Sequence, residues 1–300
     1  MTDRADASGF TERAGQVGVW LPPTVLDATA AYVLVREVAR IDALGYGSVW
    51  TGERLVGAEA FARHGQLLAS SRRLVVGTGI ANLWARVPEA MRGGAVTLAA
   101  AYPGRFVLGI GTSTPNVVER IGATYDRPLA RMRAYLERMD AVEGPPDATC
   151  PRVLAALGPK MLELAAELTD GAHPFLTPVE HTAFARTVLG PDKLLIPHQT
   201  VVLTDDRDAA RAAIRATYGP LLELATDSPY VANLRRLGYQ SDDSERVLDA
   251  LFGYGDTAAI TDRVQQHLDA GADHVLIQPF AAGLTEIVDQ LEELRSALLA

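Results

Sequence analysis

Short apolar runs alternate with helix-like segments about eight times along the chain, and this rhythm constrains the fold more than any other feature. An apolar run followed by an amphipathic segment is typical of a strand and of the helix that connects it to the next parallel strand. Eight such units favour a closed (β/α)8 barrel, the TIM barrel, over an open sheet. The strands are expected at 17–21, 48–51, 74–80, 105–111, 153–157, 171–176, 194–203 and 274–279.

Two stretches lack this rhythm. Residues 1–16 are polar and mixed in charge, which predicts a disordered N-terminal lead-in. Residues 219–255 consist of short helical pieces rich in Leu, Tyr and charge, and we interpret them as an insertion before the last strand. The remaining pattern predicts one barrel domain over residues 17–300, a size that suits this fold.

Composition excludes several classes of partner. The chain has 28 Lys and Arg against 37 Asp and Glu, a net charge of -9 that repels nucleic acid and anionic membranes. No apolar run approaches the ~20 residues that cross a bilayer. Cys150 is the only cysteine, which fits a reducing compartment. We therefore expect a soluble, cytoplasmic protein whose ligand is a small molecule.

Three aromatic or acidic side chains fall at or just after the ends of the first two strands. They are Trp20, Trp50 and Glu53, and in a TIM barrel the carboxyl ends of the strands carry the active site. We predict that the two indoles line the substrate pocket. Glu53 could act as a general acid, or it could form a structural ion pair with Arg54.

The loop after the fourth strand is small and polar. Gly109 and Gly111 in the strand would let another backbone or a ligand come close. The run is not a dinucleotide-binding fingerprint, because Thr114 stands where that motif has its third glycine. The loop is either an ordinary barrel turn or a cofactor contact made by Gly111, Thr112, Ser113 and Asn116.

The next loop turns from the fifth strand into a helix at Gly158-Pro159. Free N–H groups and the positive end of the helix dipole would face the barrel mouth there, as a phosphate requires. The alternative is a helix cap with a solvated lysine. The residues predicted to contact the cofactor here are Leu157, Gly158, Lys160 and Met161.

Six segments, in order, resemble the luciferase-like monooxygenase superfamily, in particular its deazaflavin (coenzyme F420)-dependent oxidoreductases of actinobacterial type. The segments are 44–50 (LGYGSVW), 77–82 (GTGIAN), 105–111 (RFVLGIG), 157–161 (LGPKM), 170–172 (DGA) and 271–275 (GADHV).

The resemblance implies a deazaflavin or flavin at the C-terminal mouth of the barrel, with its phosphate tail near the loops after strands four and five. It also implies a non-prolyl cis peptide near Gly79-Ile80, at the end of the third strand, with Ala81 and Asn82 beside the cofactor. The implied activity is hydride transfer between F420 and a small organic substrate, in an enzyme that is commonly a homodimer.

Two alternatives stay open. The first is an FMN-dependent monooxygenase on the same barrel. The second is a non-catalytic protein that binds a flavin or deazaflavin. Related enzymes often carry an acidic residue followed by histidine after the second strand, and this chain has Glu53-Arg54 there.

The six histidines show no spacing typical of a zinc site, so no metal is expected. His173 and His198 lie on predicted strands and could point into the barrel. His181 and His267 lie on predicted helix faces, where we expect them to be solvated.

Overall fold

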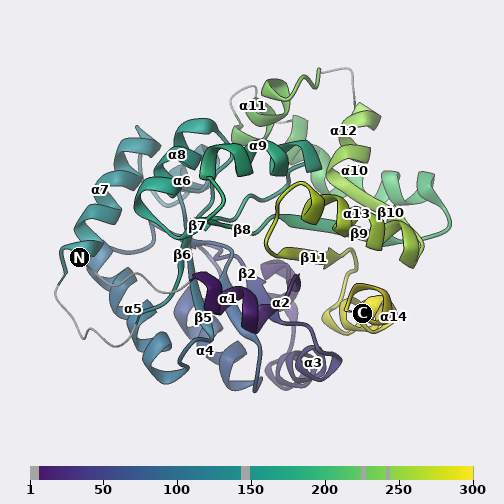
Figure 1. The fold of residues 1–300 in the computed structure, drawn as a ribbon, viewed down its shortest axis with the longest axis horizontal. Helices are drawn as coiled ribbons and strands as arrows, with labels where there is room; N and C mark the ends of the chain where they lie inside the picture. The colour runs from purple at the N-terminus through teal and green to yellow at the C-terminus, as the bar shows by residue number, and fades with distance from the viewer. Residues whose placement is uncertain (1–6, 143–148, 224–227, 241–243, 300) are drawn as a thin grey trace.

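The protein is a parallel barrel wrapped in helices, in a computed structural model that describes residues 7–142, 149–223, 228–240 and 244–299 (Figure 1). The strands are β1 (Val17–Trp20), β2 (Ser48–Thr51), β3 (Val75–Thr78), β4 (Ala81–Asn82), β5 (Phe106–Gly111), β6 (Arg152–Leu154), β7 (Gly171–Ala172), β8 (Leu194–Leu195), β9 (His198–Leu203), β10 (Phe252–Gly255) and β11 (Val275–Pro279). Their order in the sheet is β10-β9-β11-β1-β2-β3-β5-β6-β7-β8, with β4 paired to β5 outside this path.

The barrel closes through the predicted seventh strand, which is split into β8 and β9. β8 pairs with β7, and β9 pairs with β11. The break falls at Ile196 and Pro197, and proline has no N–H to contribute to a ladder. Ile196 N donates to Ala172 O on one side at 2.9 Å, and Leu276 N donates to Pro197 O on the other side at 2.9 Å. The predicted TIM barrel is confirmed.

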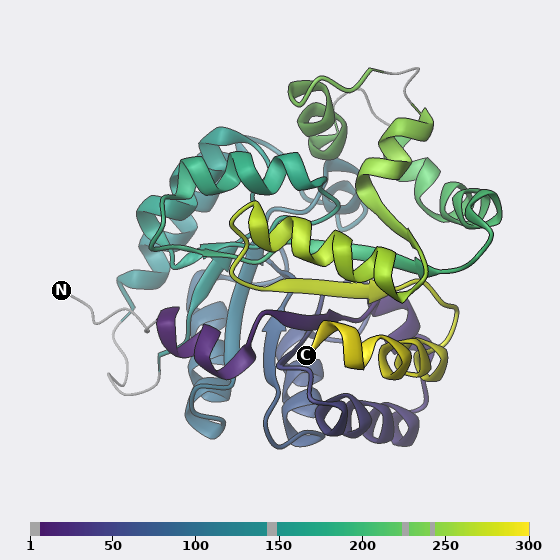
Figure 2. The ribbon, with the colours of Figure 1, turned by 45° about the vertical axis from the view of Figure 1, so that its right-hand side comes forward.

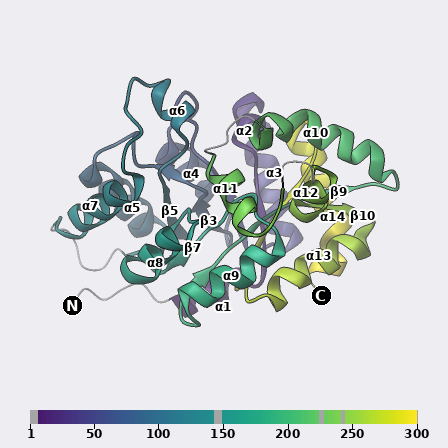
Figure 3. The ribbon, with the colours of Figure 1, turned by 90° about the horizontal axis from the view of Figure 1, so that it is seen from above.

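Helices cover the outside of the barrel. They are α1 (Ala7–Ala14), α2 (Pro23–Ala28), α3 (Ala31–Leu44), α4 (Ala60–Ala69), α5 (Pro88–Ala101), α6 (Pro115–Glu119), α7 (Pro128–Asp140), α8 (Pro159–Leu168), α9 (Val179–Leu189), α10 (Arg207–Glu223), α11 (Pro229–Arg236), α12 (Ser244–Leu251), α13 (Thr257–Asp269) and α14 (Leu284–Leu298). Seen from above, α5, α7 and α8 lie on one side and α10, α13 and α14 on the other (Figure 3). The first and last units meet where α3 packs against α14 (Figure 1).

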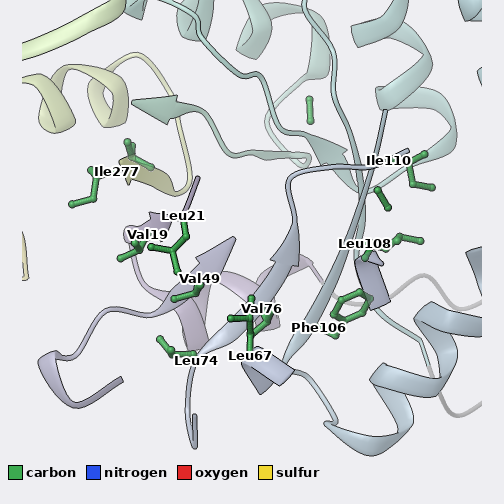
Figure 4. Packing of buried hydrophobic residues seen from close by; sticks show 14 of the residues in the cluster. Val19, Leu21, Val49, Leu67, Leu74, Val76, Phe106, Leu108, Ile110 and Ile277 are labelled. Atoms are coloured by element: carbon green, nitrogen blue, oxygen red, sulfur yellow. The ribbon is translucent and has the colours of Figure 1, made fainter. Parts of the chain in front are cut away.

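Each barrel strand buries both of its faces, as the continuous apolar runs predict. Successive side chains of a strand point to opposite faces. Val76 packs outward under the helices, together with Val19 and Val49 of the neighbouring strands (Figure 4). Val75, the residue before Val76, belongs to a separate cluster inside the barrel. The strand positions are therefore held from both sides.

Residues 7–14 form the helix α1 rather than the disordered lead-in that we predicted; residues 1–6 lie outside the described part. Phe10, only 3% exposed, meets the Trp50 ring edge to face at 6.5 Å and the His274 ring at 5.2 Å. Ala14 is buried against Gly47, where a Cβ would lie 1.7 Å from the Ala14 carbonyl oxygen. These contacts close the bottom of the barrel. The residues that α1 contacts lie on or next to β2 and β11, so the local sequence of α1 does not predict them.

The predicted insertion contains α11, α12 and one strand that we did not predict, β10; residues 224–227 and 241–243 of it are outside the described part. β10 pairs with β9 in register Phe252 to Thr200, and Phe252 is fully buried. The run Phe-Gly-Tyr-Gly is a weak strand signal because glycine packs no side chain. Backbone pairing with β9 stabilises β10 in spite of this low strand propensity. Beside it, α13 lies along β11 (Figure 2).

None of the helices in the described residues combines the length and apolar character needed to span a bilayer.

Candidate active site

A cavity of about 490 Å³ opens over the carboxyl ends of the barrel strands. This volume lies within the range of small-molecule sites. The lining residues come from the loops after β1 to β7 and from α11. They are Trp20, Gly52, Glu53, Gly79, Ile80, Thr112, Ser113, Thr114, Val117, Tyr125, Pro128, Ala155, Ala156, Leu157, Gly158, Met161, His173, Phe175, Pro229 and Tyr230.

One wall of the cavity is the bend between β3 and β4. The peptide bond between Gly79 and Ile80 is cis, as the family resemblance predicted. Both residues line the cavity, whereas Ala81 and Asn82, predicted beside them, are buried and are not among its lining residues. The Asn82 side chain instead accepts a hydrogen bond from Trp84 N at 3.0 Å. Asn82 therefore helps to hold the loop after β4, and its predicted contact with the cofactor stays a prediction.

The glycines of β5 make room for this bend. A Cβ on Gly109 would lie 2.0 Å from the Thr78 carbonyl oxygen, and one on Gly111 would lie 2.6 Å from the Ile80 side chain. Of the two possibilities in the sequence, close approach of another part of the chain is the one observed. Gly111 is buried, and the cavity lining begins with the next residue, Thr112.

Glu53 lines the cavity but is not paired with Arg54. Its two carboxylate oxygens accept hydrogen bonds from the guanidinium of Arg86, and one also accepts a bond from Asn82 N at 2.7 Å. Arg54 instead contacts Asp27 at 3.0 Å. Because a forked guanidinium contact suits an ionised carboxylate, Glu53 is a structural ion-pair member in this geometry rather than a proton donor.

Trp20 and Trp50 are register partners on β1 and β2, yet only Trp20 lines the cavity. The indole of Trp50 is fully buried inside the barrel and packs against Phe10. Its Nε1 donates to Ser48 Oγ at 3.1 Å. Trp50 is therefore a core residue, and the prediction that it contacts substrate is not supported by its position.

The hydroxyl loop after β5 lies at the cavity as predicted. Thr112, Ser113 and Thr114 all line it, and Thr112 Oγ1 lies 3.3 Å from the Tyr125 hydroxyl. Asn116 does not line it. The sequence placed this residue in the loop, but α6 already begins at Pro115, so Asn116 is exposed on the helix and Val117 faces the cavity instead.

The loop after β6 contributes Leu157, Gly158 and Met161 to the lining, as predicted. A Cβ on Gly158 would meet no atom within 4 Å, so the space beside it is open. Gly158 is also the N-cap of α8, a ten-residue helix whose positive dipole end faces this space. Lys160 is exposed and is not among the lining residues, so its predicted contact with the cofactor stays a prediction.

Two polar atoms at the cavity floor have no hydrogen-bond partner in the part of the chain that the structure describes. They are Trp20 Nε1 and His173 Nε2, on side chains that are more than nine-tenths buried. A Cβ on Gly79 would lie 2.9 Å from the first nitrogen and 3.0 Å from the second, so both flank the cis bend. Buried polar groups are nearly always paired, which makes this pair the least satisfied part of the site.

All six histidines are buried, including His181 and His267, which we expected to be solvated. His267 is bonded to Thr182 at 2.8 Å and to Gln199 at 2.9 Å, contacts to α9 and β9 that its own helix does not reveal. Burial lowers the pKa of His267 to about 3 and that of His181 to about 4. Both rings are neutral core groups.

Sequence reasoning missed most of the aromatic lining, namely Tyr125, Phe175 and Tyr230. Phe175 stacks on His198 at 4.1 Å and lies 5.0 Å from the Trp20 ring. Its place near the carboxyl end of the strand predicted at 171–176 was a usable signal. Tyr230 comes from α11 in the insertion, whose path no local pattern predicts.

Among the described residues, no three His, Cys, Asp or Glu side chains come together in a way that could hold a metal ion.

A cavity at the carboxyl ends of a closed parallel barrel, walled by glycine and hydroxyl loops, has the architecture of a TIM-barrel enzyme. The comparisons with known proteins identify which kind. Residues 16–274 match the family model described as luciferase-like monooxygenase. The chain therefore belongs to the luciferase-like monooxygenase family, and the resemblance noted in the sequence is confirmed.

Two relatives illustrate the range of similarity. A protein of Mycobacterium tuberculosis (strain H37Rv), provisionally named a coenzyme F420-dependent oxidoreductase, is 31% identical over 255 residues, covering 67% of this chain and 72% of the relative. The 5,10-methylenetetrahydromethanopterin reductase of Archaeoglobus fulgidus is 26% identical over 298 residues, covering 89% of this chain and 87% of the relative.

Solved structures share the fold at lower identity. An F420-dependent secondary alcohol dehydrogenase in complex with an F420-acetone adduct has a TM-score of 0.74 at 16% identity, covering 94% of this chain and 98% of its own. The FMN-bound oxygenating constituent of 3,6-diketocamphane monooxygenase from Pseudomonas putida has a TM-score of 0.67 at 13% identity, covering 94% and 96%.

Proposed function

We propose that the protein is an F420-dependent oxidoreductase that transfers a hydride between the deazaflavin and a small, neutral organic substrate. The observation that carries this proposal is the cavity of about 490 Å³ at the barrel mouth, walled by the cis bend at Gly79-Ile80. The names of the two relatives described above, both linked to F420 or to methanopterin reduction, support the choice of cofactor.

The residues present suit such a cofactor. The hydroxyls of Thr112, Ser113 and Thr114 can donate to phosphate or ribityl oxygens, and the open space beside Gly158 lies at the positive end of α8. When bound, the deazaflavin supplies a carbon that accepts or gives a hydride. The protein's own part is to hold the ring against the bend and to keep water out.

The charge of the lining argues for a neutral substrate. Glu53 is the one charged residue among the lining residues named above, and Arg86 already pairs with it. An anionic substrate would meet no unpaired cation from this set, and burying an unpaired charge is costly. Trp20, Phe175 and Tyr230 offer apolar surface with few polar atoms, which suits a neutral molecule.

Titration of the purified protein with F420 and with FMN, followed by absorbance and fluorescence, tests the proposal. We expect F420 to bind and FMN to bind more weakly. Tight FMN binding without F420 binding would instead support the FMN-dependent monooxygenase. F420 binding without turnover across a panel of neutral alcohols, ketones and enones would support a non-catalytic binding protein.

We also propose that the protein is a cytoplasmic homodimer, as is common for proteins that it resembles. Light scattering after size exclusion tests the assembly, and a mass of one 32.1 kDa chain would contradict it.

A further inference from the structure

The two unpartnered nitrogens at the cavity floor have complementary hydrogen-bonding roles. His173 Nδ1 lies 2.7 Å from the carbonyl oxygen of Ile196, which can only accept, so Nδ1 carries the proton. Burial lowers the pKa of His173 to about 4, so the ring is neutral and Nε2 is a free acceptor. Trp20 Nε1–H can only donate. The floor therefore offers one donor and one acceptor beside the same glycine.

The bottom of the barrel contains the same combination with its partner in place. Trp50 Nε1 donates to Ser48 Oγ at 3.1 Å, and Ser48 Oγ lies 2.7 Å from His274 Nε2. His274 Nδ1 is bonded to the Gly15 carbonyl oxygen at 2.8 Å, so Nε2 is again the acceptor. One hydroxyl thus accepts from an indole and donates to an imidazole. At the cavity floor the indole and the imidazole are present and the hydroxyl is missing.

We propose that Trp20 and His173 bind the reacting oxygen of a neutral alcohol substrate, with His173 as the base that takes the hydroxyl proton. The substrate hydroxyl would accept from Trp20 Nε1 and donate to His173 Nε2, as Ser48 does at the bottom of the barrel. A Cβ built on Gly79 would lie 2.9 Å from Trp20 Nε1 and 3.0 Å from His173 Nε2, so the two nitrogens are less than about 6 Å apart, a separation that one ligand oxygen hydrogen-bonded to both can span. This inference rests on the proposed function.

Among the other polar side chains of the lining, those of Glu53, Thr112 and Tyr125 already have partners. Both carboxylate oxygens of Glu53 are bonded to Arg86, and Thr112 and Tyr125 bond each other. The loop after β2 has Arg54 where related enzymes often carry histidine, and Arg54 contacts Asp27. His173, from the opposite side of the barrel, supplies the imidazole that this loop lacks.

The chemistry balances as an alcohol oxidation. The O–H bond breaks and its proton goes to His173 Nε2. The C–H bond of the carbinol carbon breaks and its electron pair leaves as hydride, with the deazaflavin of the proposed function as the acceptor. The C–O bond becomes a carbonyl, and its oxygen keeps the hydrogen bond from Trp20.

Nuclear magnetic resonance on the full chain, labelled with ¹⁵N at histidine and tryptophan, tests the contact without turnover. Cyclohexanol, benzyl alcohol and 2-octanol serve as probes, with and without F420. We expect at least one probe to shift both the His173 Nε2 and the Trp20 Nε1 signals and to leave Trp50 and His274 unchanged. If none of the probes shifts either nitrogen, the inference is wrong.

Kinetics test the base. In His173→Ala we expect kcat for alcohol oxidation to fall by roughly 10²-fold or more, with F420 affinity within threefold, and added imidazole to restore part of the rate. Trp20→Phe should raise KM more than the matched Trp50→Phe, whose ring packs against His173 at 5.2 Å but does not line the cavity. Unchanged kcat in His173→Ala with F420 bound would overturn the inference and leave the proposed function standing. Failure of F420 to bind the wild type would overturn the proposed function, and the resonance shifts would still test the pair.

Discussion

The two ends of the barrel interior each carry a tryptophan and a histidine, and they differ in what lies between them. At the bottom, Ser48 bridges Trp50 and His274. At the mouth, Trp20 Nε1 and His173 Nε2 lie beside a cavity and have no partner among the described residues. The same residue types therefore build a closed structural network at one end and an open binding site at the other.

This difference shows that residue type alone does not mark a functional group in this fold. A buried indole or imidazole whose hydrogen bonds are all made contributes to stability. Removing its partner would leave a buried polar group unpaired, which lowers the free energy of unfolding. One whose bonds are unmade contributes little to stability and is available to a ligand. Variants at the two ends should therefore separate loss of stability from loss of binding.

The largest effect should come from acid, which acts on both ends alike. Burial lowers the pKa of His173 and that of His274 to about 4, below the ~6.5 of an unfolded chain. Below about pH 6.5 the unfolded chain binds protons that the folded chain does not, so stability falls as pH drops. The loss at pH 5 is roughly 2 kcal/mol per such histidine. Urea unfolding at pH 7.5 and pH 5 measures it.

Replacing each histidine in turn compares the bottom and the mouth of the barrel in this pH experiment. His173→Leu should reduce the acid sensitivity and lower stability at pH 7.5 only by the loss of one hydrogen bond, that to the Ile196 carbonyl oxygen. His274→Leu should reduce it too, but it should lower stability at pH 7.5, because Ser48 and the Gly15 carbonyl lose their partner. Equal losses at pH 7.5 would contradict the distinction between the two pairs.

Removing the bridge at the bottom should cost stability and nothing else. Ser48→Ala leaves Trp50 Nε1 and His274 Nε2 buried without partners, which typically costs about 1–3 kcal/mol. Chemical denaturation measures the change. Affinity for F420 should stay within twofold of the wild type, and a large loss of affinity would mean that the two ends are coupled.

Filling the mouth should do the opposite. Gly158→Leu would place its side chain in open space beside the cavity, so the fold should tolerate it while F420 affinity falls tenfold or more, about 1.4 kcal/mol. Thermal unfolding and a fluorescence titration give the two quantities. Lys160→Leu, at an exposed position two residues on, is the control and should leave affinity unchanged. Equal loss of stability and affinity in Gly158→Leu would contradict the assignment.

The smallest effect should be that of Trp20→Phe on stability. This indole N–H has no partner, so its removal should change the free energy of unfolding by less than about 0.5 kcal/mol. Trp50→Phe removes a bonded N–H and should cost more than Trp20→Phe. Chemical denaturation of the two variants side by side makes the comparison. A larger loss in Trp20→Phe would mean that its N–H has a partner in solution.

Much of the fold could be predicted because its strands are continuous apolar runs with glycine and proline at their ends. The strand predicted at 48–51 has the bounds of β2 in the structure. What failed depends on distant contacts. α1 is held by Trp50 and His274, and β10 is held by β9. Neither partner is near in sequence.

The site divides in the same way. The loops after β5 and β6 could be located because strand ends in a barrel share one face. The direction of individual side chains could not. Trp20 and Trp50 are register partners, but one indole packs against Phe175 at the mouth and the other against Phe10 at the bottom. Glu53 forms its ion pair with Arg86, which lies in the loop after β4, and not with its sequence neighbour Arg54.

The helix α1 has a consequence for the order in which the chain can be completed. It leaves the ribosome well before the His274 ring that packs on Phe10. Val275 N also donates to the Gln16 carbonyl oxygen at 2.8 Å, joining the two ends of the chain. Because a chain is synthesised from the N-terminus, α1 can meet Trp50 early, but its contact with His274 has to wait until that residue has been made. Sealing of the barrel bottom is therefore a late event in biosynthesis.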